Sequence, residues 1–383
     1  MFKNFSASYA GHVVDDNLGF DGTPANDRWY PNEKLAETYD WALQIARHLE
    51  ACGYDEFWMA EHHFQPEGYE GIPNLLMLGL YLATQTETLK YGCGFNITPM
   101  WHPLRLAEDF AMADILTRGR IIFGVGRGYH TREVETFGAP MRDSDANREL
   151  FEEQVEVMVK AFNEDSFSHE GKHFQIPARV PYRGYELEKL TLVPRPLSRP
   201  VEIWQPLVSG NPRGVEFMAR MGIKPLLANT PEPTLGERLR MFQQAQLDLG
   251  QETQLGENAA LGFRMFLAES REKAIEKAKP YFEEAMKFAA PLGLMALNQD
   301  QIDAVAAGRR SGGVKLPTLE EAVEGGGWIC GTPEVAVEAL KKAEETYPGV
   351  ERVNIGSVMG MPLEVFKDQL SIFAEGVMPA FKG

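Results

Sequence analysis

Residues 121–128 read Ile-Ile-Phe-Gly-Val-Gly-Arg-Gly, an apolar run that ends in glycines around one arginine. A short, continuous apolar run of this kind is typical of a strand that is buried on both faces of a parallel sheet. Seven further β-rich runs alternate with helical patterns along the chain, at 3–6, 57–60, 91–95, 201–204, 225–228, 262–267 and 353–356. Eight such units favour a closed barrel over an open sheet, so the sequence predicts an α/β fold, a (β/α)8 TIM barrel.

The helices between these strands have clear sequence signals. One apolar stripe precedes Gly53, a typical C-terminal stop, and consists of Leu35, Tyr39, Ala42, Ala46 and Leu49. Thr332 and Pro333 have the order of an N-cap and a first helical residue. A last helix is expected at about 362–374.

Composition and charge exclude several classes of partner. Lys and Arg total 38 against 55 Asp and Glu, which gives a formal net charge of −17. Such a field repels phosphate backbones and anionic lipids, so nucleic acids and membrane surfaces are not expected as partners. Three cysteines without CxxC spacing are typical of a reducing compartment. Because no signal-peptide core and no apolar run of roughly 18 residues is found, we expect a cytoplasmic protein.

No linker separates two cores, so we expect one domain over residues 1–383 with three insertions. The first is a polar loop at about 7–31. The second, at about 164–198, contains an expected hairpin around 171–174. The third, at about 290–328, is rich in glycine. Because long loops in compact domains are usually functional or mobile, we expect the third insertion to be a mobile lid.

The active site of such a barrel lies at the C-terminal ends of its strands. After the second strand comes Glu61-His62-His63-Phe64. Adjacent side chains of an extended segment point to opposite sides, so we expect His62 and His63 to face different surroundings, and both could be ordinary loop residues. A metal site is not expected there, because neighbouring residues rarely chelate one ion and no third ligand is nearby.

Three other histidines have structural explanations. His169 and His173 have ligand-like spacing, but they fall in the expected hairpin and should lie at the surface. His102 is expected at the start of a helix. The small Gly94, after the third strand, could let a flat ligand approach the backbone.

The loops after the fourth and fifth strands have features of an anion site. Arg127 lies between Gly126 and Gly128, where its forked donors could bind a phosphate or carboxylate, although a tight turn with a solvent-facing arginine has the same pattern. This is not a dinucleotide fingerprint, because Tyr129 occupies the position of the third glycine. The run Ser-Gly-Asn-Pro-Arg-Gly at 209–214 leads into a helix and could hold an anion or be an ordinary N-cap. A barrel brings both loops to one rim.

An ordered set of motifs resembles the bacterial luciferase-like monooxygenase family, and its luciferase α subunits in particular. The motifs lie at 60–64, 99–105, 108–109, 118–120, 123–128, 209–214, 331–334, 360–362 and 377–379. Their order is specific, and the resemblance covers nearly the whole chain outside the insertions. It implies a luciferase-like (β/α)8 barrel.

The resemblance also implies roles for individual residues. His62 matches the family's catalytic histidine beside the flavin, and Gly94-Phe95 match its non-proline cis peptide under the isoalloxazine ring. The reactive cysteine of luciferase is Gly126 here, which argues against light emission. The expected cofactor-binding residues are Gly94, Phe95, Arg127, Gly128, Tyr129, Ser209, Gly210, Asn211 and Arg213. The expected substrate contacts are His63, Phe64 and Trp101.

By this resemblance the chain is expected to be an FMN-dependent monooxygenase that uses reduced FMN and O2 to oxidise a small, apolar substrate. A histidine with an unperturbed pKa of about 6.5 suits proton transfer in such a site. Without a Rossmann fingerprint, nicotinamide should not bind tightly, so FMNH2 would come from a separate NAD(P)H:flavin reductase. The family implies a homodimer. An F420-dependent oxidoreductase on the same barrel and a non-catalytic flavin-binding protein remain alternatives.

Overall fold

The computed structural model describes residues 2–295, 297–306 and 314–382. Its centre is a closed barrel of eight parallel strands, β1 (Asn4–Tyr9), β2 (Glu56–Met59), β3 (Lys90–Cys93), β5 (Ile121–Gly126), β10 (Ile203–Pro206), β11 (Lys224–Ala228), β12 (Ala260–Phe263) and β15 (Arg352–Gly356). The strands pair in this order, and β15 pairs with β1 to close the ring. Each predicted run overlaps one of these strands, so the predicted (β/α)8 barrel is confirmed.

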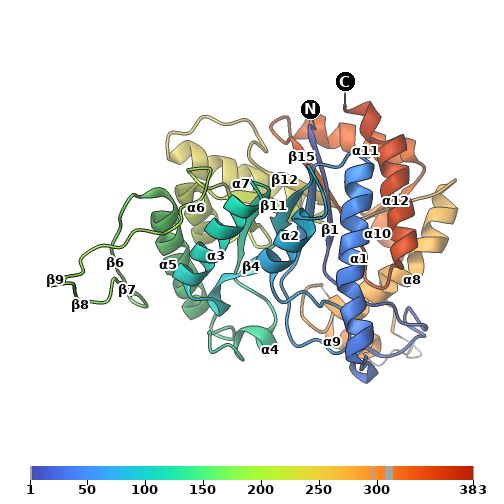
Figure 1. Ribbon diagram of the computed structural model, residues 1–383. Coiled ribbons are helices and arrows are strands. Elements are labelled where there is room, and N and C mark those ends of the chain that lie inside the picture. The colour runs from blue at the N-terminus through green and yellow to red at the C-terminus, as the bar shows by residue number, and fades with distance from the viewer. Residues whose placement is uncertain (1, 296, 307–313, 383) are drawn as a thin grey trace.

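Helices surround the barrel, and the two chain ends lie near each other (Figure 1). The longer helices are α1 (Asn32–Ala51), α2 (Leu75–Ala83), α3 (Pro103–Leu116), α5 (Ser144–Asn163), α6 (Pro212–Met221), α7 (Thr234–Asp248), α8 (Arg271–Ala289), α11 (Pro333–Thr346) and α12 (Leu363–Gly376). The predicted stripe on α1 is correct for Ala42, Ala46 and Leu49, which are buried, whereas Tyr39 stays exposed. No helix in the described part of the chain could span a membrane.

Shorter elements complete the described chain. They are α4 (Thr131–Val134), α9 (Gln299–Ala306), α10 (Leu319–Glu324), η1 (Ala25–Asp27), η2 (Thr98–Met100), η3 (Met378–Ala380), β4 (Asn96–Ile97), β13 (Met265–Leu267) and β14 (Ile329–Gly331). The predicted strand at 262–267 breaks at Arg264 into β12 and β13. After the break, β13 pairs with β14 in a separate two-stranded sheet.

Two tryptophans fill the interior of the barrel. The rings of Trp58 and Trp204 meet edge to face with centroids 5.8 Å apart. Gly92 pairs with Trp58 across β2 and β3, and a Cβ on Gly92 would lie 2.2 Å from the indole. Glycine is therefore required at this position if the indole is to lie inside the barrel.

At the level of these tryptophans and beyond them, toward the C-terminal ends of the strands, the inner face carries small residues. Ser8 pairs with both Trp58 and Gly356, so it lies on the same face as the indole. Ala228 pairs with Gly262 in the same way on β11 and β12. This end of the barrel thus presents little side-chain volume.

The polar loop after β1 is attached to α8 by buried charges. Arg28 lies 2.6 Å from Glu284, and Lys287 lies 3.0 Å from the same carboxylate. The Lys287 ammonium also donates to the carbonyl of Gly19 in the loop. Because a buried charge is costly unless it is paired, this network fixes the path of the loop.

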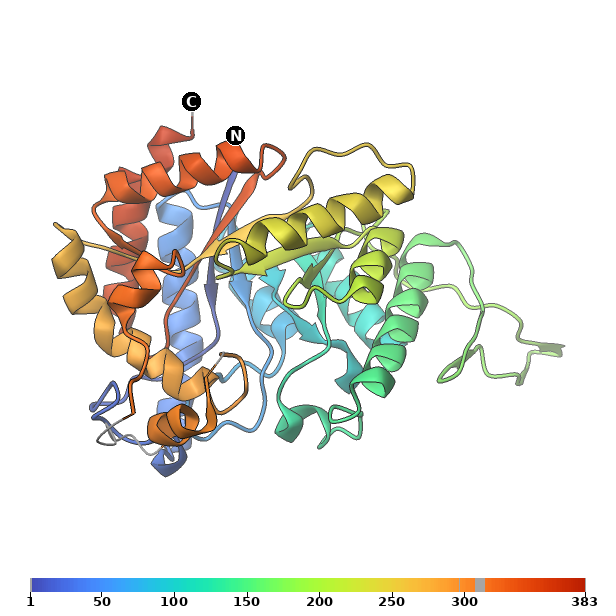
Figure 2. The ribbon, with the colours of Figure 1, turned by 180° about the vertical axis from the view of Figure 1, so that it is seen from behind.

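The second insertion carries two hairpins and projects from the body of the protein (Figure 2). The first, between β6 (His169–Glu170) and β7 (Gln175–Ile176), is the predicted one. The second, between β8 (Pro181–Tyr182) and β9 (Tyr185–Glu186), was not predicted. His169 and His173 were both expected at the surface. This is wrong for His169, which is buried and whose Nε2 lies 3.1 Å from Glu153, and right for His173, which is exposed.

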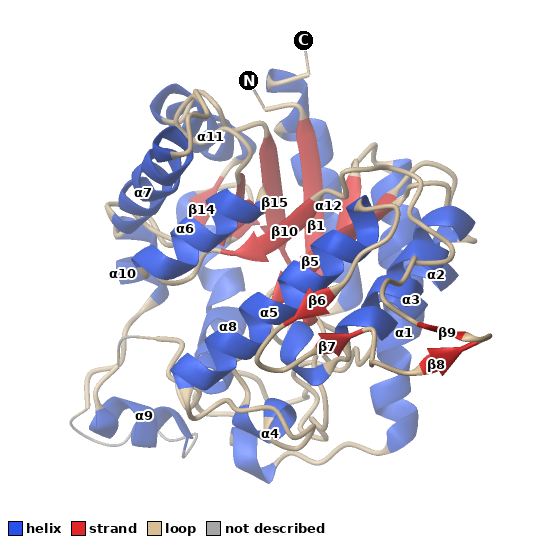
Figure 3. Cartoon of the chain, turned by 90° about the vertical axis from the view of Figure 1, so that its left-hand side faces the viewer, coloured by secondary structure: helices blue, strands red, loops and turns tan. Residues whose placement is uncertain are grey.

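The third insertion is not one continuous loop, since α9 and α10 lie within it (Figure 3). Residues 296 and 307–313, which include most of its Gly-rich run, lie outside the described residues. Its role as a lid stays a prediction.

Candidate active site

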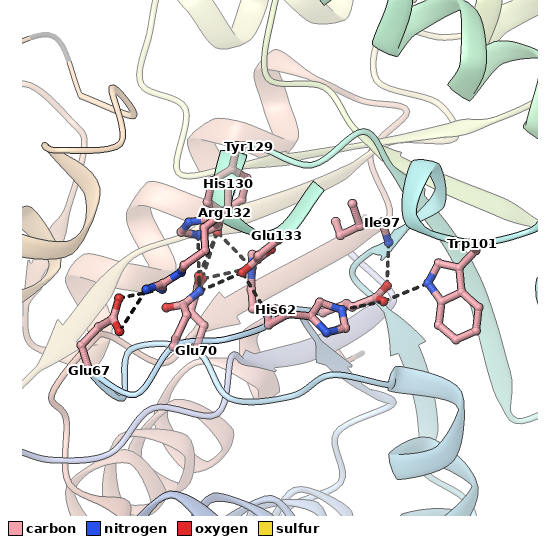
Figure 4. Close-up of polar contacts among 12 residues, drawn as sticks. His62, Glu67, Glu70, Ile97, Trp101, Tyr129, His130, Arg132 and Glu133 are labelled. Carbon is pink, nitrogen blue, oxygen red and sulfur yellow. Dashed lines mark hydrogen bonds and ion pairs between the residues drawn. The ribbon is translucent and has the colours of Figure 1, made fainter. Parts of the chain in front are cut away.

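His62 follows β2 and is 4% exposed. Both ring nitrogens have partners (Figure 4). Nδ1 lies 3.3 Å from the carboxylate of Glu133. Nε2 lies 3.0 Å from the hydroxyl of Tyr129 and 3.2 Å from Glu70. The imidazole is therefore fixed between two carboxylates, that of Glu70 in the loop after β2 and that of Glu133 in α4.

The two carboxylates are satisfied by further donors. Glu70 accepts from the Tyr129 hydroxyl at 2.9 Å, and His130 Nε2 lies 3.1 Å from its other oxygen. Glu133 accepts from the backbone N–H of His63 at 2.9 Å. These contacts form one connected network, which rigidifies a buried polar site when every member is paired.

The charges in this network decide the protonation state of His62. Burial alone lowers the pKa of His62, but Glu70 and Glu133 outweigh it and hold this pKa above its usual value. Burial raises the pKa of Glu133, yet the hydrogen bond from His62 leaves it below its usual range. The surroundings of His62 therefore favour its protonated form more than water does. The expectation of an unperturbed histidine is corrected, because the pKa is raised.

The same side chains also have the spacing of metal ligands. His62, Glu70 and His130 each offer one ligand atom within 4.8 Å of the others, all buried. The expectation that no third ligand is near His62 is therefore wrong, because folding brings Glu70 and His130 to it. Both histidines contact the carboxylate of Glu70, so the same three side chains also form part of the hydrogen-bond network around His62.

His63 faces a different carboxylate, as the alternation predicted. Its Nε2 lies 3.1 Å from Glu61, which also accepts from the indole N–H of Trp101 at 2.9 Å. Phe64 is half exposed and stacks on Phe137 with ring centroids 5.5 Å apart. The expected substrate contacts thus form one group, with Phe64 at its exposed edge.

The second part of the candidate site is built around Arg127. Its Nε donates to Asn147 at 2.8 Å, and a terminal nitrogen donates to the carbonyl of Ser144 at 3.1 Å. The loop after β10 ends in Asn211, whose side chain accepts from the N–H of Gly214 and so caps α6. Arg213, in the first turn of α6, pairs with Glu152 at 2.6 Å.

A third arginine, Arg148 on α5, belongs to this group. Its guanidinium lies so close to α6 that a Cβ on Gly214 would be 2.7 Å from it. Burial lowers the pKa of Arg127, and the positive charges of Arg148 and Arg213 lower it further. Three arginines that repel one another beside a capped helix N-terminus form a site suited to an anion.

The remaining expected cofactor residues lie near these two groups. The peptide bond between Gly94 and Phe95 is cis, as the resemblance implied, and Phe95 packs against Trp58. Gly128 has a positive φ of 81°, which favours glycine. The Tyr129 hydroxyl faces His62 and Glu70, so only its ring is left for a cofactor contact. Ser209 and Gly210 are exposed just before α6.

Sequence reasoning missed several members of the site, namely Glu70, His130, Glu133, Arg148 and Asn147. His130 and Glu133 follow β5 within a few residues of Arg127, so inspecting the whole loop after that strand would have found them. The other three lie away from strand ends, and no local pattern marks them. His102 is the N-cap of α3, as expected.

A comparison with known protein families decides the classification. The profile of the luciferase-like monooxygenase family matches residues 20–348. The chain belongs to this family. The luciferase-like fold predicted from the sequence is confirmed.

Individual relatives of this luciferase-like protein are distant. It is 34% identical over 135 residues to the alkanal monooxygenase alpha chain of the Kryptophanaron alfredi symbiont. The matched residues make up 35% of this chain and 36% of that protein. The chain thus spans about a third of the length of this curated relative.

Solved structures share the fold over nearly the whole length. The FMN-bound oxygenating constituent of 3,6-diketocamphane monooxygenase from Pseudomonas putida has a TM-score of 0.74 at 18% identity, with 99% of both chains covered. An F420-dependent secondary alcohol dehydrogenase has a TM-score of 0.69 at 17% identity, with 99% of both chains covered. At such identities the likeness shows the fold alone.

The raised pKa of His62 predicts a pH dependence of stability. A folded-state pKa above the unfolded value contributes stability that is fully present below about pH 6.5 and is lost as the pH rises through the folded pKa. The free energy of unfolding, measured by urea titration between pH 6 and 9, should therefore fall less steeply in His62→Gln than in the wild type.

His48→Gln is the matched control, because the His48 ring contacts a backbone carbonyl and the Ser371 hydroxyl rather than a carboxylate. If His62→Gln leaves the pH slope of the wild type unchanged, the pKa of His62 is not raised in the folded protein and the assignment is wrong.

Proposed function

We propose that the chain is an FMN-dependent monooxygenase that uses reduced FMN and O2 to oxidise a small, apolar organic substrate. The observation that carries this proposal is the position of the arginine group. It follows β5 and β10 at the C-terminal end of the barrel, where the inner face carries small residues and the His62 network lies. One rim therefore offers an anion site, room for a flat ring and an acid.

The residues present fit FMN. Arg127, Arg148 and the N-terminus of α6 supply charge and free N–H groups for a phosphate. Gly94 and Phe95 would lie under a flat ring above Trp58, in the part of the barrel that Ser8 and Gly262 leave open. When bound, the reduced flavin would supply the chemistry that activates O2.

The chain's own groups would control protons and water. The raised pKa of His62 favours its protonated form, and its Nε2 lies 3.0 Å from the Tyr129 hydroxyl, through which a proton could be released. Glu70 bridges Tyr129 and His130 and can compensate the charge change. Phe64 and Phe137 would cover the exposed edge and exclude water from the reacting atoms.

Reduced FMN would come from a separate NAD(P)H:flavin reductase. A multi-component arrangement of this kind is implied by the name of the similar oxygenating constituent from Pseudomonas putida. The alternative is F420, whose phosphate could bind the same arginines, and the similar alcohol dehydrogenase uses it on the same fold. Binding experiments should therefore include both cofactors.

We also propose a homodimer formed through α2 and α3. These neighbouring helices expose four large apolar side chains, Met77 (71%), Tyr81 (48%), Met112 (50%) and Leu116 (59%). Exposed apolar groups gathered on adjacent helices are typical of protein interfaces. A second copy of the chain is the partner that the family implies.

Removal of the central arginine tests the cofactor site. Arg127→Ala should weaken the binding of FMNH2 by about 1.5–3 kcal/mol, because it removes charge-assisted hydrogen bonds. Anaerobic titration of FMNH2 measures the effect, with Arg132→Ala as the control, since Arg132 pairs with Glu67 outside the arginine group. Unchanged affinity in Arg127→Ala, or binding of F420 but not of FMNH2, would overturn the assignment.

Substitution of each of the two adjacent histidines in turn tests whether His62 is the proton donor. His62→Gln should reduce turnover with supplied FMNH2 and O2 by about 10²–10⁴-fold and keep most of the flavin affinity, because a positioned acid is lost. His63→Gln is the matched control and should keep turnover nearer to the wild type. If only the His63 variant loses activity, the roles are reversed, and if neither does, a non-catalytic flavin-binding protein becomes the better account.

Charges on α2 and α3 test the dimer. The double variant Met77→Glu, Leu116→Glu should be monomeric in size-exclusion chromatography with light scattering, because it places like charges on the proposed interface. Leu249→Glu changes an equally exposed leucine elsewhere and should leave the dimer intact. A monomeric wild type would contradict the proposal.

A further inference from the structure

A cavity of about 560 Å³ lies between α7, α10 and α11, beside β12 and β14. The two longer helices cross the back of the molecule near each other (Figure 2). Apart from Gly262, which also borders the proposed space for the flavin ring, the residues that line the cavity are distinct from those assigned to the candidate active site. Its volume lies within the range of small-molecule sites, which is roughly 300–1,000 Å³.

Three cationic side chains line this cavity, those of Arg264, Arg271 and Lys342. Within the described residues, none of the three forms an ion pair with a carboxylate. Arg264 lies at the break between β12 and β13, and burial lowers the pKa of its guanidinium, with no acidic neighbour to offset it. Because a desolvated charge is costly when unpaired, this position favours a negatively charged ligand.

The acidic residues of the cavity do not fill this role. Glu232 lines the cavity, but its carboxylate accepts from the hydroxyl of Tyr347 and from the N–H of Gly236. Glu324 lies at the exposed end of α10. Three cations, none of them ion-paired within the described residues, therefore stand against these two acidic residues in the lining. Arg264 is half-buried, whereas Arg271 and Lys342 are exposed.

The rest of the lining is largely apolar. Phe263, Trp328 and Leu235 contribute large side chains, and Ala339 gives a small one on the α11 side. A ligand that is anionic at one end and apolar along its length would match both parts of this surface.

We propose that this cavity is a second binding site, for a small amphipathic anion whose carboxylate or phosphate head contacts Arg264 and whose apolar chain lies along Phe263 and Trp328. The site goes beyond the proposed oxidation, since it shares no residue with the arginine group around Arg127 or with the His62 network.

Isothermal titration calorimetry of the full chain tests this proposal, with octanoate and octyl phosphate as probes for the two possible heads. Binding of at least one is expected, together with weaker binding of inorganic phosphate and of octanol, which carry one half of the chemistry each. Arg264→Gln should weaken the bound probe by at least about 10-fold, since it removes a charge-assisted contact. Arg118→Gln, which removes one exposed arginine elsewhere, should not.

A second variant tests the apolar part of the cavity without removing a cation. Ala339→Phe keeps every cation but fills the apolar part of the cavity, so it should also weaken the probe. Titration of FMNH2 in the same variants should be unchanged, which distinguishes this site from the cofactor site. No binding of either amphiphile to the wild type, or equal binding to Arg264→Gln, would overturn the proposal and leave Arg264 as an arginine solvated by water.

Discussion

The pairing of β5 with β10, two neighbouring strands of the barrel, is the constraint on which the site depends. Ile203 pairs with Phe123 and Trp204 with Gly124, so strands that are far apart in sequence become neighbours. The loop that carries Arg127 and the loop that caps α6 then emerge side by side. On its other side β5 lies against β3, where a Cβ on Gly124 would lie 1.9 Å from the carbonyl oxygen of Cys93, so the close approach of these two strands requires glycine. Without the pairing of β5 and β10, the two loops that carry the arginine group would not meet.

Charge balance explains the other half of the site. Three buried carboxylates, those of Glu61, Glu70 and Glu133, lie beside three histidines in a region with little solvent. The carboxylates raise the pKa of His62, and the hydrogen bond from His62 in turn lowers the pKa of Glu133. The acid is therefore a product of its surroundings, and its pKa is not a property of the residue alone.

The fold was accessible from the sequence because buried parallel strands are marked by short apolar runs, which Phe57, Val125 and Ile355 all illustrate. The site was accessible in part, since His62 and Arg127 directly follow strands. Arg148 and Glu70 could not be found this way, because they reach the site from a helix and from a long loop through three-dimensional contacts. The break at Arg264 was equally hidden, since the residues on both sides of it look like one strand.

The buried pairing of Arg28 and Lys287 with Glu284 has a consequence for how such barrels can be recombined. The loop after β1 and the helix α8 are more than two hundred residues apart, yet they share one set of charges. If the loop alone were transplanted into another barrel, Arg28 would lack the carboxylate of Glu284. In the original barrel, Glu284 would keep Lys287 as a partner but would lose Arg28. The two segments form one exchangeable module, and inheritance or engineering of this wall must move them together.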